Sequence, residues 1–432
     1  MREIRFMWGL IARNLSVCLC LSMLTALAWA QTESSANRST LSLPEALART
    51  MARSPELVAF GYQIEAAEGR LRQAGLAPNP ELGVVVEDMF GTDALRGMDS
   101  AETTVTLGWV LERGVRERLV DTASAGVSLR TLDAEIVRLD TAAETARRFV
   151  DCLAYQARLL NAIEAVRLAE ETVEAVKVRV AAARALDAEL ARAEAELVRA
   201  ELLKADYEHE LLSAYHRLSA QWGEPQPDFG SVSGELESLP VVEPLATVLS
   251  RAEQNPELIR FMSQQRLNEA ELRLAEAQSR PSWRVYGGLR RIEQTDDFAL
   301  VGGITVPLAV RNKNEGRIAE ARANVAGADA EASAARVRLE TELFVLYQEL
   351  RHQTETAGRL REDMVPRIER ALADTRRAYE LGRYSYFEWS VVQAELLEAT
   401  NALLEASIGA QQIVIEIERL TGVQLVLPAT AQ

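Results

Sequence analysis

The stretch RSPELVAF at residues 53–60 returns as QNPELIRF at residues 254–261. In both copies Pro-Glu-Leu is followed by a phenylalanine, and the two prolines are 201 residues apart. The same spacing relates four further identical pairs: Glu68 and Glu269, Leu71 and Leu272, Ala74 and Ala275, and Pro80 and Pro281. We therefore expect the 432-residue chain to contain two copies of one structural plan.

Each copy begins with two predicted helices. The first helix covers 43–53 in one copy and 244–254 in the other. Ser54 and Asn255 are N-cap residue types, and the proline after each is pre-organised for the first position of the second helix. Pro80 and Pro281 prevent that helix from continuing.

Strand-like segments follow, at 81–90 and 101–111 in the first copy and at 282–292 and 298–308 in the second. The stretch TVTLGW at 104–109 alternates, so that Val105, Leu107 and Trp109 share one face. Period-two alternation is the signal of a strand. Taken alone, these pairs favour ordinary hairpins on a soluble core over a membrane barrel.

The long segments that follow argue against the soluble-core alternative. No glycine or proline occurs between Gly126 and Gly223, and strong helix formers dominate, as they do again from about 316 to 421. Helices of about 60 residues approach ~100 Å, too long for a compact globule. Each segment is predicted to turn once. Gly382 and the capping box of Ser385 with Glu388 mark the second turn, and Asp187 can cap the helix after the first.

The ends of the chain indicate export. Residues 1–30 combine early arginines, an apolar run and Ala28-Trp29-Ala30, which is the pattern of a signal peptide. A retained membrane anchor is the alternative, and lipidation is disfavoured because neither Cys18 nor Cys20 follows a small residue. The resulting division is a signal peptide at 1–30, a first repeat at 31–222, a Pro-, Gly- and Ser-rich linker at 223–244 and a second repeat at 245–432.

Charge and cysteine content exclude some classes of partner and an intramolecular disulfide. Removing three arginines and one glutamate with the signal leaves 45 basic and 63 acidic residues, a formal charge of −18. This argues against nucleic acid or an anionic membrane surface as partner. Cys152 is the one cysteine left in the mature chain, so no intramolecular disulfide can form.

No apolar run of about 18 residues follows the signal, so no transmembrane helix is expected. A chain that enters the membrane without one must do so as a β-barrel. The four predicted strands cannot close a barrel, so several chains must pool them. Three chains would supply twelve strands and leave an open lumen, although the number three is not visible in the sequence.

With this plan the chain resembles the TolC-type outer-membrane efflux proteins over essentially its whole mature length. The resemblance rests on the duplicated Pro-Glu-Leu helix start and on three stretches: LERGVRERLVDTASA at 111–125, VPLAVRNKNEGRIAEARA at 306–323 and YELGRYSYFEW at 379–389. The second of these is most similar to the heavy-metal-efflux, CzcC-like branch.

The resemblance implies a mainly α fold with a small β part, in which each chain gives four strands to a trimeric 12-stranded barrel. It implies a homotrimer in outer-membrane lipid with its helices in the periplasm. A periplasmic adaptor would join it to an inner-membrane resistance-nodulation-division pump. The chain would be a passive exit duct for divalent metal cations, with no catalysis and no cofactor. Ducts for drugs or for one-step protein secretion remain alternatives, and so does a periplasmic coiled-coil scaffold.

Several residues carry site hypotheses, each with a structural alternative. Glu388 matches the acids that line the family's periplasmic entrance, but it also completes a capping box, and Val391 stands where the family usually has a second acid. Asp374 and Asp187 are weaker gate candidates.

Tyr379, Gly382 and Ser385 match the family's adaptor-docking tip, although turn chemistry explains them equally well. Trp109 and Trp283 are candidates for an interfacial aromatic belt, or for packing where barrel and helices join.

Metal binding by the duct itself has little support in the sequence. His209 and His216 lie seven residues apart on one predicted helix, His352 is isolated, and the methionines do not cluster. No P-loop, G-x-S-x-G or H-E-x-x-H motif is present. We therefore predict no metal ligands and no catalytic residues.

Overall fold

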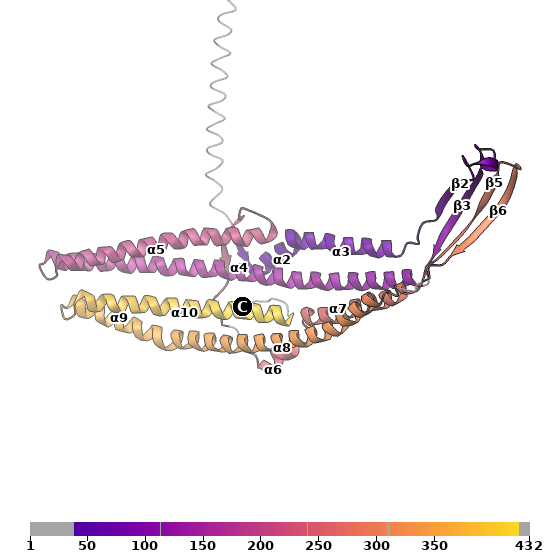
Figure 1. The fold of residues 1–432 in the computed structure, drawn as a ribbon. Helices are drawn as coiled ribbons and strands as arrows, with labels where there is room; N and C mark the ends of the chain where they lie inside the picture. Colours follow the sequence, from indigo (N-terminus) through magenta and orange to yellow (C-terminus); the bar gives the residue numbers. More distant parts are fainter. Residues whose placement is uncertain (1–38, 113, 240, 309–311, 423–432) are drawn as a thin grey trace, which may run out of the picture.

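The computed structural model describes residues 39–112, 114–239, 241–308 and 312–422. The predicted signal peptide at 1–30 lies outside these residues. Figure 1 shows an elongated molecule in which long helices run side by side and a small sheet projects from one end. The helical hairpins turn at the opposite end, which we call the tip.

The sheet contains all four predicted strands, in the order β2-β3-β5-β6. They span Glu81–Glu87, Glu102–Leu111, Trp283–Ile292 and Asp297–Thr305, and every neighbour is antiparallel. Two ends differ from the prediction by more than one residue. Strand β2 stops before 88–90 because Asp88 and Phe90 have positive φ, and β6 stops before Pro307, which has no N–H for a ladder. A short 3₁₀ turn, η1 at Asp93–Leu95, lies in the β2–β3 loop.

The helices recur in the same order in both halves. The first half contains α2 (Leu43–Arg53), α3 (Pro55–Ala74), α4 (Val115–Ala181) and α5 (Asp187–Ser219). The second contains α6 (Leu245–Ala252), α7 (Pro256–Gln278), α8 (Glu315–Arg359), α9 (Val365–Glu380) and α10 (Tyr386–Thr421). Ser54 and Asn255 are the N-caps of α3 and α7 as predicted, and the Asn255 side chain accepts a hydrogen bond from the Glu257 N–H.

The two halves differ in their longest helix. Helix α4 runs unbroken for 67 residues, which is about 100 Å at the usual rise. Its counterpart in the second half is interrupted by a π-helical turn at Leu360–Met364, which ends two residues before Pro366. A proline removes one helix hydrogen bond and crowds the preceding turn, and this accounts for a break at that place.

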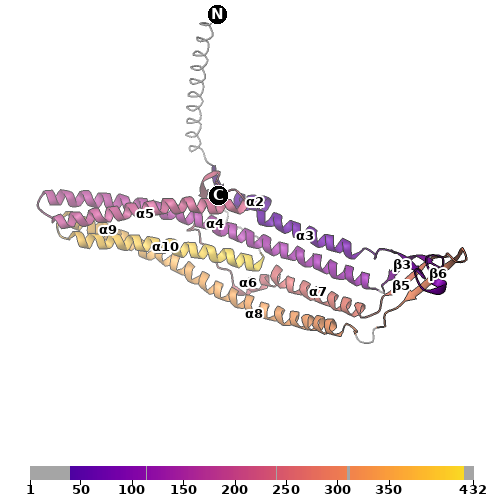
Figure 2. The same ribbon diagram turned by 45° about the horizontal axis from the view of Figure 1, so that its top comes forward.

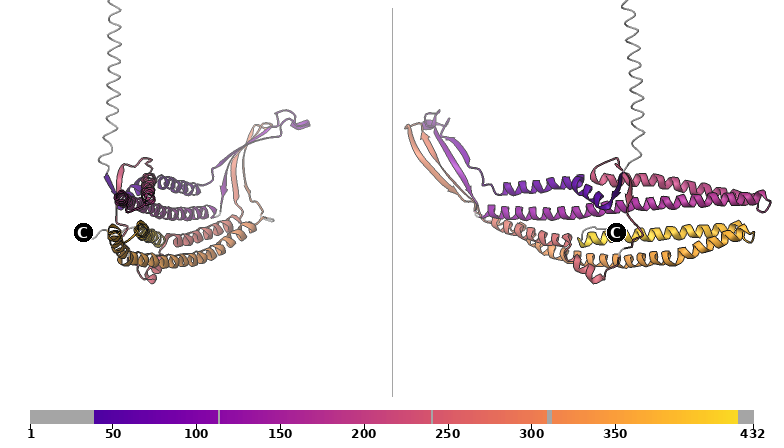
Figure 3. Two further views of the ribbon diagram at one scale, coloured as in Figure 1. Left: turned by 90° about the vertical axis from the view of Figure 1, so that its left-hand side faces the viewer. Right: turned by 180° about the vertical axis from the view of Figure 1, so that it is seen from behind.

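The helices near the sheet form a wall that continues the strand order. Helix α3 packs on α4, α4 on α7, and α7 on α8, so the order α3-α4-α7-α8 matches β2-β3-β5-β6 (Figure 2). The sheet rises from the end where these helices converge (Figure 3). One edge of the wall is therefore α3 with β2, and the other is α8 with β6.

The predicted linker at 223–244 contains a short strand. After the 3₁₀ turn η2 (Ala220–Trp222), strand β4 (Phe229–Ser233) pairs in parallel with β1 (Ser39–Ser42). Phe229 is fully buried in the largest core cluster, together with Phe149 and Leu218. The Gln156 amide extends this sheet: it donates to the Val232 carbonyl at 3.0 Å and accepts from the Val232 N–H at 2.8 Å.

None of the helices in the described part of the chain combines the length and the hydrophobicity that crossing a membrane requires.

Candidate functional sites at the tip and on the sheet

Both helical hairpins turn at the tip through a residue in the left-handed region. In the second hairpin this residue is Gly382, with φ of 74°, as predicted. In the first hairpin it is Ala183, with φ of 54°. A side chain with a Cβ is strained in this conformation, whereas glycine adopts it freely. The first turn is therefore the more strained of the two.

Exchanging these residues should move stability in opposite directions. We expect Ala183→Gly to stabilise the first turn by about 1 kcal/mol and Gly382→Ala to destabilise the second by a similar amount. A methyl group at Gly382 would meet no atom closer than Arg179 Nη2, at 3.9 Å, so the cost there is conformational and not steric. Thermal melting of each variant measures both effects. Equal melting shifts of the same sign would contradict the assignment.

The predicted capping box of the second hairpin is present. The Glu388 N–H donates to Ser385 Oγ at 3.4 Å, and Glu388 Oε2 accepts from the Ser385 N–H at 2.7 Å and from its hydroxyl at 2.9 Å. The hydrogen bond from the Ser385 backbone, followed by that from its hydroxyl, lowers the pKa of Glu388 below its ordinary 4.5. The carboxylate is thus already engaged locally, which supports the capping role. Its role as a gate remains a prediction.

The other two acids lie apart from this box. Asp187 is the first residue of α5 and the N-cap is Leu186, so the predicted cap was wrong. The turn through Ala183 leaves Leu186 in an extended conformation, and the helix starts directly after it. Asp187 still lies in the first turn, where a negative charge is favourable. Asp374 lies exposed on α9, before the turn.

Removing the Glu388 carboxylate should loosen the start of α10. Because the folded-state pKa of Glu388 is lowered, its contribution to stability is present above pH 4.5 and lost as the pH falls below that value. We expect Glu388→Ala to melt at a lower temperature than the wild type at pH 7, with the difference shrinking towards pH 3.5. A melting difference that did not vary with pH would exclude this cap. Unchanged channel leak in the same variant would leave Glu388 without a gate role.

Beneath the turns lies a small apolar core. Tyr379, Tyr386 and Trp389 are 1%, 3% and 2% exposed, and the Tyr379 and Trp389 rings lie 5.0 Å apart. Val176 of α4 and Ala193 of α5 complete the cluster. Tyr379 therefore packs inside the tip and is not itself a surface residue, whereas Gly382 and Ser385 are exposed.

Arg179 is a tip residue that could not be predicted from the sequence. It lies on α4 and donates to the carbonyl oxygen of Tyr379, 200 residues away. Its guanidinium also lies 4.3 Å from the centre of the Tyr379 ring and donates to the Arg184 carbonyl at 3.3 Å. One arginine thus joins the two hairpins. Its partners are backbone carbonyls, which leave no pattern in the sequence.

Two further contacts tie the hairpins together near the tip. Arg376 of α9 pairs with Glu171 of α4 at 3.1 Å. Gln393 of α10 donates to the Thr172 hydroxyl of α4 at 2.9 Å. The resting position of the second hairpin against the first is therefore held by polar contacts on both sides of the aromatic cluster: Arg179 on the side of the turns, and these two pairs on the far side.

The sheet separates its residues by chemistry. The strand registers place one set on a single face, and apart from Thr103 and Arg291 that face carries only apolar residues and glycine. Its larger members are Leu82, Val84, Val86, Val105, Leu107, Trp109, Leu111, Trp283, Val285, Leu289, Phe298, Leu300 and Ile304. The predicted alternation is confirmed. Both tryptophans lie at the helix end of this face, since Trp109 opposes Val285 and Trp283 opposes Leu111.

The opposite face carries most of the charged and polar residues of the sheet, together with apolar ones such as Val85, Val110, Ile292 and Val301, and we call it the polar face. Its charged residues are Glu81, Glu87, Glu102, Arg284, Arg290 and Asp297. Glu81 and Arg284 pair at 3.6 Å near the helix end. A sheet that is apolar on one face and charged on the other is suited to separating lipid from water.

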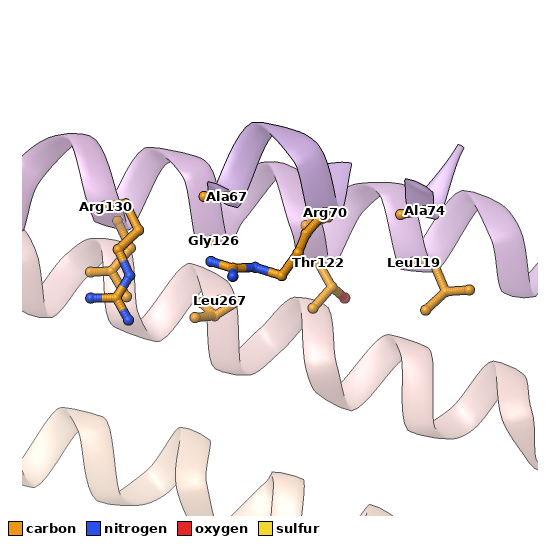
Figure 4. Close-up of a pocket in the computed structure, with 10 residues that line it drawn as sticks. Ala67, Arg70, Ala74, Leu119, Thr122, Gly126, Arg130 and Leu267 are labelled. Atoms are coloured by element: carbon orange, nitrogen blue, oxygen red, sulfur yellow. The ribbon is translucent and has the colours of Figure 1, made fainter. Parts of the chain in front are cut away.

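A groove of about 370 Å³ lies between α3 and α4 near the sheet end (Figure 4). Small residues line it, with Leu267 of α7 beside it and with Arg70 and Arg130 on α3 and α4.

Among the described residues, no group of three or more His, Cys, Asp or Glu side chains is placed to hold a metal ion. Cys152 is buried, and burial raises the pKa of its thiol to about 12, which makes it a poor nucleophile.

Comparison with known proteins shows which class the chain is similar to. Residues 46–224 match the family described as outer membrane efflux protein. The chain is thus similar to outer-membrane efflux proteins of the TolC type. Proteins of this class are non-enzymatic ducts with their helical part in the periplasm.

Particular relatives refine this class. The cobalt-zinc-cadmium resistance protein CzcC of Cupriavidus metallidurans is 26% identical over 384 residues, covering 88% of this chain and 90% of the relative. The outer membrane protein VceC of Vibrio cholerae has the same fold, with a TM-score of 0.71 at 18% identity, over 88% of this chain and 96% of that one. The MtrE channel of Neisseria gonorrhoeae, solved in its open state, matches with a TM-score of 0.66 at 17% identity, over 88% and 89% of the two chains.

Proposed function

We propose that this chain is the passive outer-membrane exit duct of a tripartite efflux system for divalent heavy-metal cations. The observation that carries this proposal is the wall in which β2-β3-β5-β6 continues as α3-α4-α7-α8, with an open edge on each side. The similarity to CzcC, whose name states cobalt, zinc and cadmium resistance, supports the choice of cargo. A periplasmic adaptor and an inner-membrane pump would supply the substrate and the energy.

The open edges favour a trimer. In lipid, the free N–H and C=O groups of β2 and β6 must find partners, and four strands cannot close on themselves. Three copies supply twelve strands, enough for an open lumen. The two halves, 31–222 and 245–432, would then provide near-equivalent parts of one wall. Apolar side chains also stand exposed on the outer helices, among them Val198 and Leu202 of α5 and Phe344 and Val345 of α8.

The sheet would lie in the membrane with its apolar face towards lipid. Trp109 and Trp283 are 45% and 37% exposed at the helix end of that face. Trp283 and Arg291 are eight positions apart on β5, roughly 26 Å along a strand. This length is close to the apolar band of about 25 Å in outer-membrane proteins. We therefore assign the two tryptophans to the aromatic belt on the periplasmic side.

The tip would dock the adaptor. Gly382 and Ser385 lie on its surface, and the nearby apolar side chains of Leu381, Tyr384 and Phe387 are 63%, 45% and 57% exposed. Tyr379 supports this surface from below. Exposed aromatic residues around a turn are the kind of surface on which a partner helix packs.

The assembly can be tested on the purified mature protein. We expect it to leave the membrane only with detergent and to have the mass of three chains by mass photometry. A soluble monomer in the periplasmic fraction would exclude the duct and favour a periplasmic scaffold.

The cargo can be tested with a deletion strain and its complemented control. We expect sensitivity to zinc, cobalt and cadmium, without added sensitivity to hydrophobic drugs. Drug sensitivity alone would keep the duct and reject the metal cargo. No sensitivity to either would favour protein secretion.

A further inference from the structure

Two acidic side chains oppose each other on the polar face of the sheet. Glu87 of β2 and Glu102 of β3 are direct partners in the antiparallel ladder, at the end where the strands meet their loops. Like charges in directly opposed positions destabilise a strand pair. These two positions therefore need a positive charge close by.

Arg290 supplies that charge from the next strand. It opposes Thr104 in the β3–β5 ladder, and each of its three nitrogens makes one contact. Nη1 lies 2.6 Å from Glu102, Nε lies 3.0 Å from the Thr104 hydroxyl, and Nη2 lies 3.4 Å from Glu87. The guanidinium thus links three strands. We call Glu87, Glu102 and Arg290 the exit cluster.

The neighbouring arginine serves a different purpose. Arg291 lies on the apolar face, where it pairs with Glu293 at 2.8 Å and with Asp296 at 3.0 Å. It also lies 5.8 Å from the Phe298 ring centre. Arg291 therefore closes the β5–β6 turn and does not reach the exit cluster. Adjacent in sequence and similar in charge, it is a matched control for Arg290.

We propose that Arg290 is the fixed counter-cation of the Glu87–Glu102 pair, and that it keeps the duct from retaining the divalent cations that leave through it. The inference rests on the proposed function, in which the polar face lines the lumen. Three exit clusters would then surround the passage at its loop end. Each has two carboxylates and one guanidinium, so it retains a net charge of −1.

This arrangement suits a passage for metal ions. Carboxylates are ligands that divalent cations accept, and two of them held side by side would slow the departure of an ion. Conduction requires attraction strong enough to admit an ion and weak enough to release it. A guanidinium fixed on the neighbouring strand competes with the metal ion for the two carboxylates. It does so at a high effective concentration and cannot diffuse away. The residual negative charge still favours cations over anions.

The test is zinc binding to the purified full-length protein by equilibrium dialysis, compared among wild type, Arg290→Gln and Arg291→Gln. We expect Arg290→Gln to bind one additional zinc ion per chain with at least tenfold higher affinity than any such site in the wild type. Arg291→Gln should match the wild type. The double variant Glu87→Gln with Arg290→Gln should lose the added ion. Equal binding by the two single variants would overturn the proposal.

A second comparison covers the possibility that Arg290→Gln does not fold. Glu87→Gln in the presence of Arg290 removes repulsion and should leave zinc binding unchanged, because the pair is already occupied. A fall in zinc binding would mean that the pair holds metal despite Arg290, and the proposal would fail. Because the exit cluster lies within one chain, these results are independent of the oligomeric mass and of the deletion phenotype that test the proposed function.

Discussion

Replacing Arg179 by alanine is expected to open the resting duct and to raise its leak roughly tenfold. Arg179 joins the two hairpins through the Tyr379 carbonyl and ring. Hydrogen bonds from a charged donor contribute about 1.5–3 kcal/mol. A loss of about 1.4 kcal/mol shifts a two-state equilibrium tenfold. The hairpins would therefore separate far more often at the tip.

Single-channel conductance in planar bilayers measures this leak, and sensitivity of cells to a large antibiotic that normally cannot cross the outer membrane provides a second reading. Lys177→Ala is the control, since Lys177 lies two residues away on α4 and its contact with Glu174, at 3.9 Å, is exposed. A leak that is the same in both variants would mean that Arg179 does not hold the duct closed.

Replacing Trp389 by alanine is expected to melt the tip while leaving the remaining structure intact. Truncating a buried tryptophan typically costs about 3–5 kcal/mol. Trp389 is 2% exposed and stacks on Tyr379 in a core cluster separate from that around Phe149. Because the cluster is small, local opening there does not require unfolding of the whole helix. We expect faster proteolytic cleavage at the tip, nearly unchanged helical circular dichroism, and loss of metal resistance.

Phe387→Ala is the matched control for this variant. Phe387 lies two residues away, is 57% exposed and contacts Arg192 at 5.8 Å from its ring. Its loss should leave proteolysis unchanged. Lower metal resistance in this folded variant would place the adaptor on the exposed side of the tip. Equal proteolysis of the two variants would show that the Trp389 cluster does not hold the tip together.

The features that could be predicted from the sequence depend on neighbouring residues. The capping box of Ser385 and Glu388, the turn at Gly382 and the alternation in β3 are each set within a few positions. The N-cap at Leu186 was missed because Ala183 adopts a conformation that alanine rarely takes. Local rules thus succeed where the residue type and the backbone conformation agree.

The features that could not be predicted depend on how distant elements meet. Arg179 and Tyr379 lie on different hairpins, and Arg290 reaches Glu87 across an intervening strand. Strand β4 forms because β1 and the Gln156 amide are both beside it in space. Charged residues are frequent in this sequence, so their pairing cannot be inferred before the strand register and the helix packing are known.

If divalent cations leave the cell through this duct, the rate of metal efflux must depend on it. Cells of the deletion strain and the complemented strain would be loaded with zinc or cobalt, transferred to metal-free medium and followed by elemental analysis. We expect metal to leave the complemented cells and to remain in the deletion strain. Equal rates of loss from both strains would contradict the account.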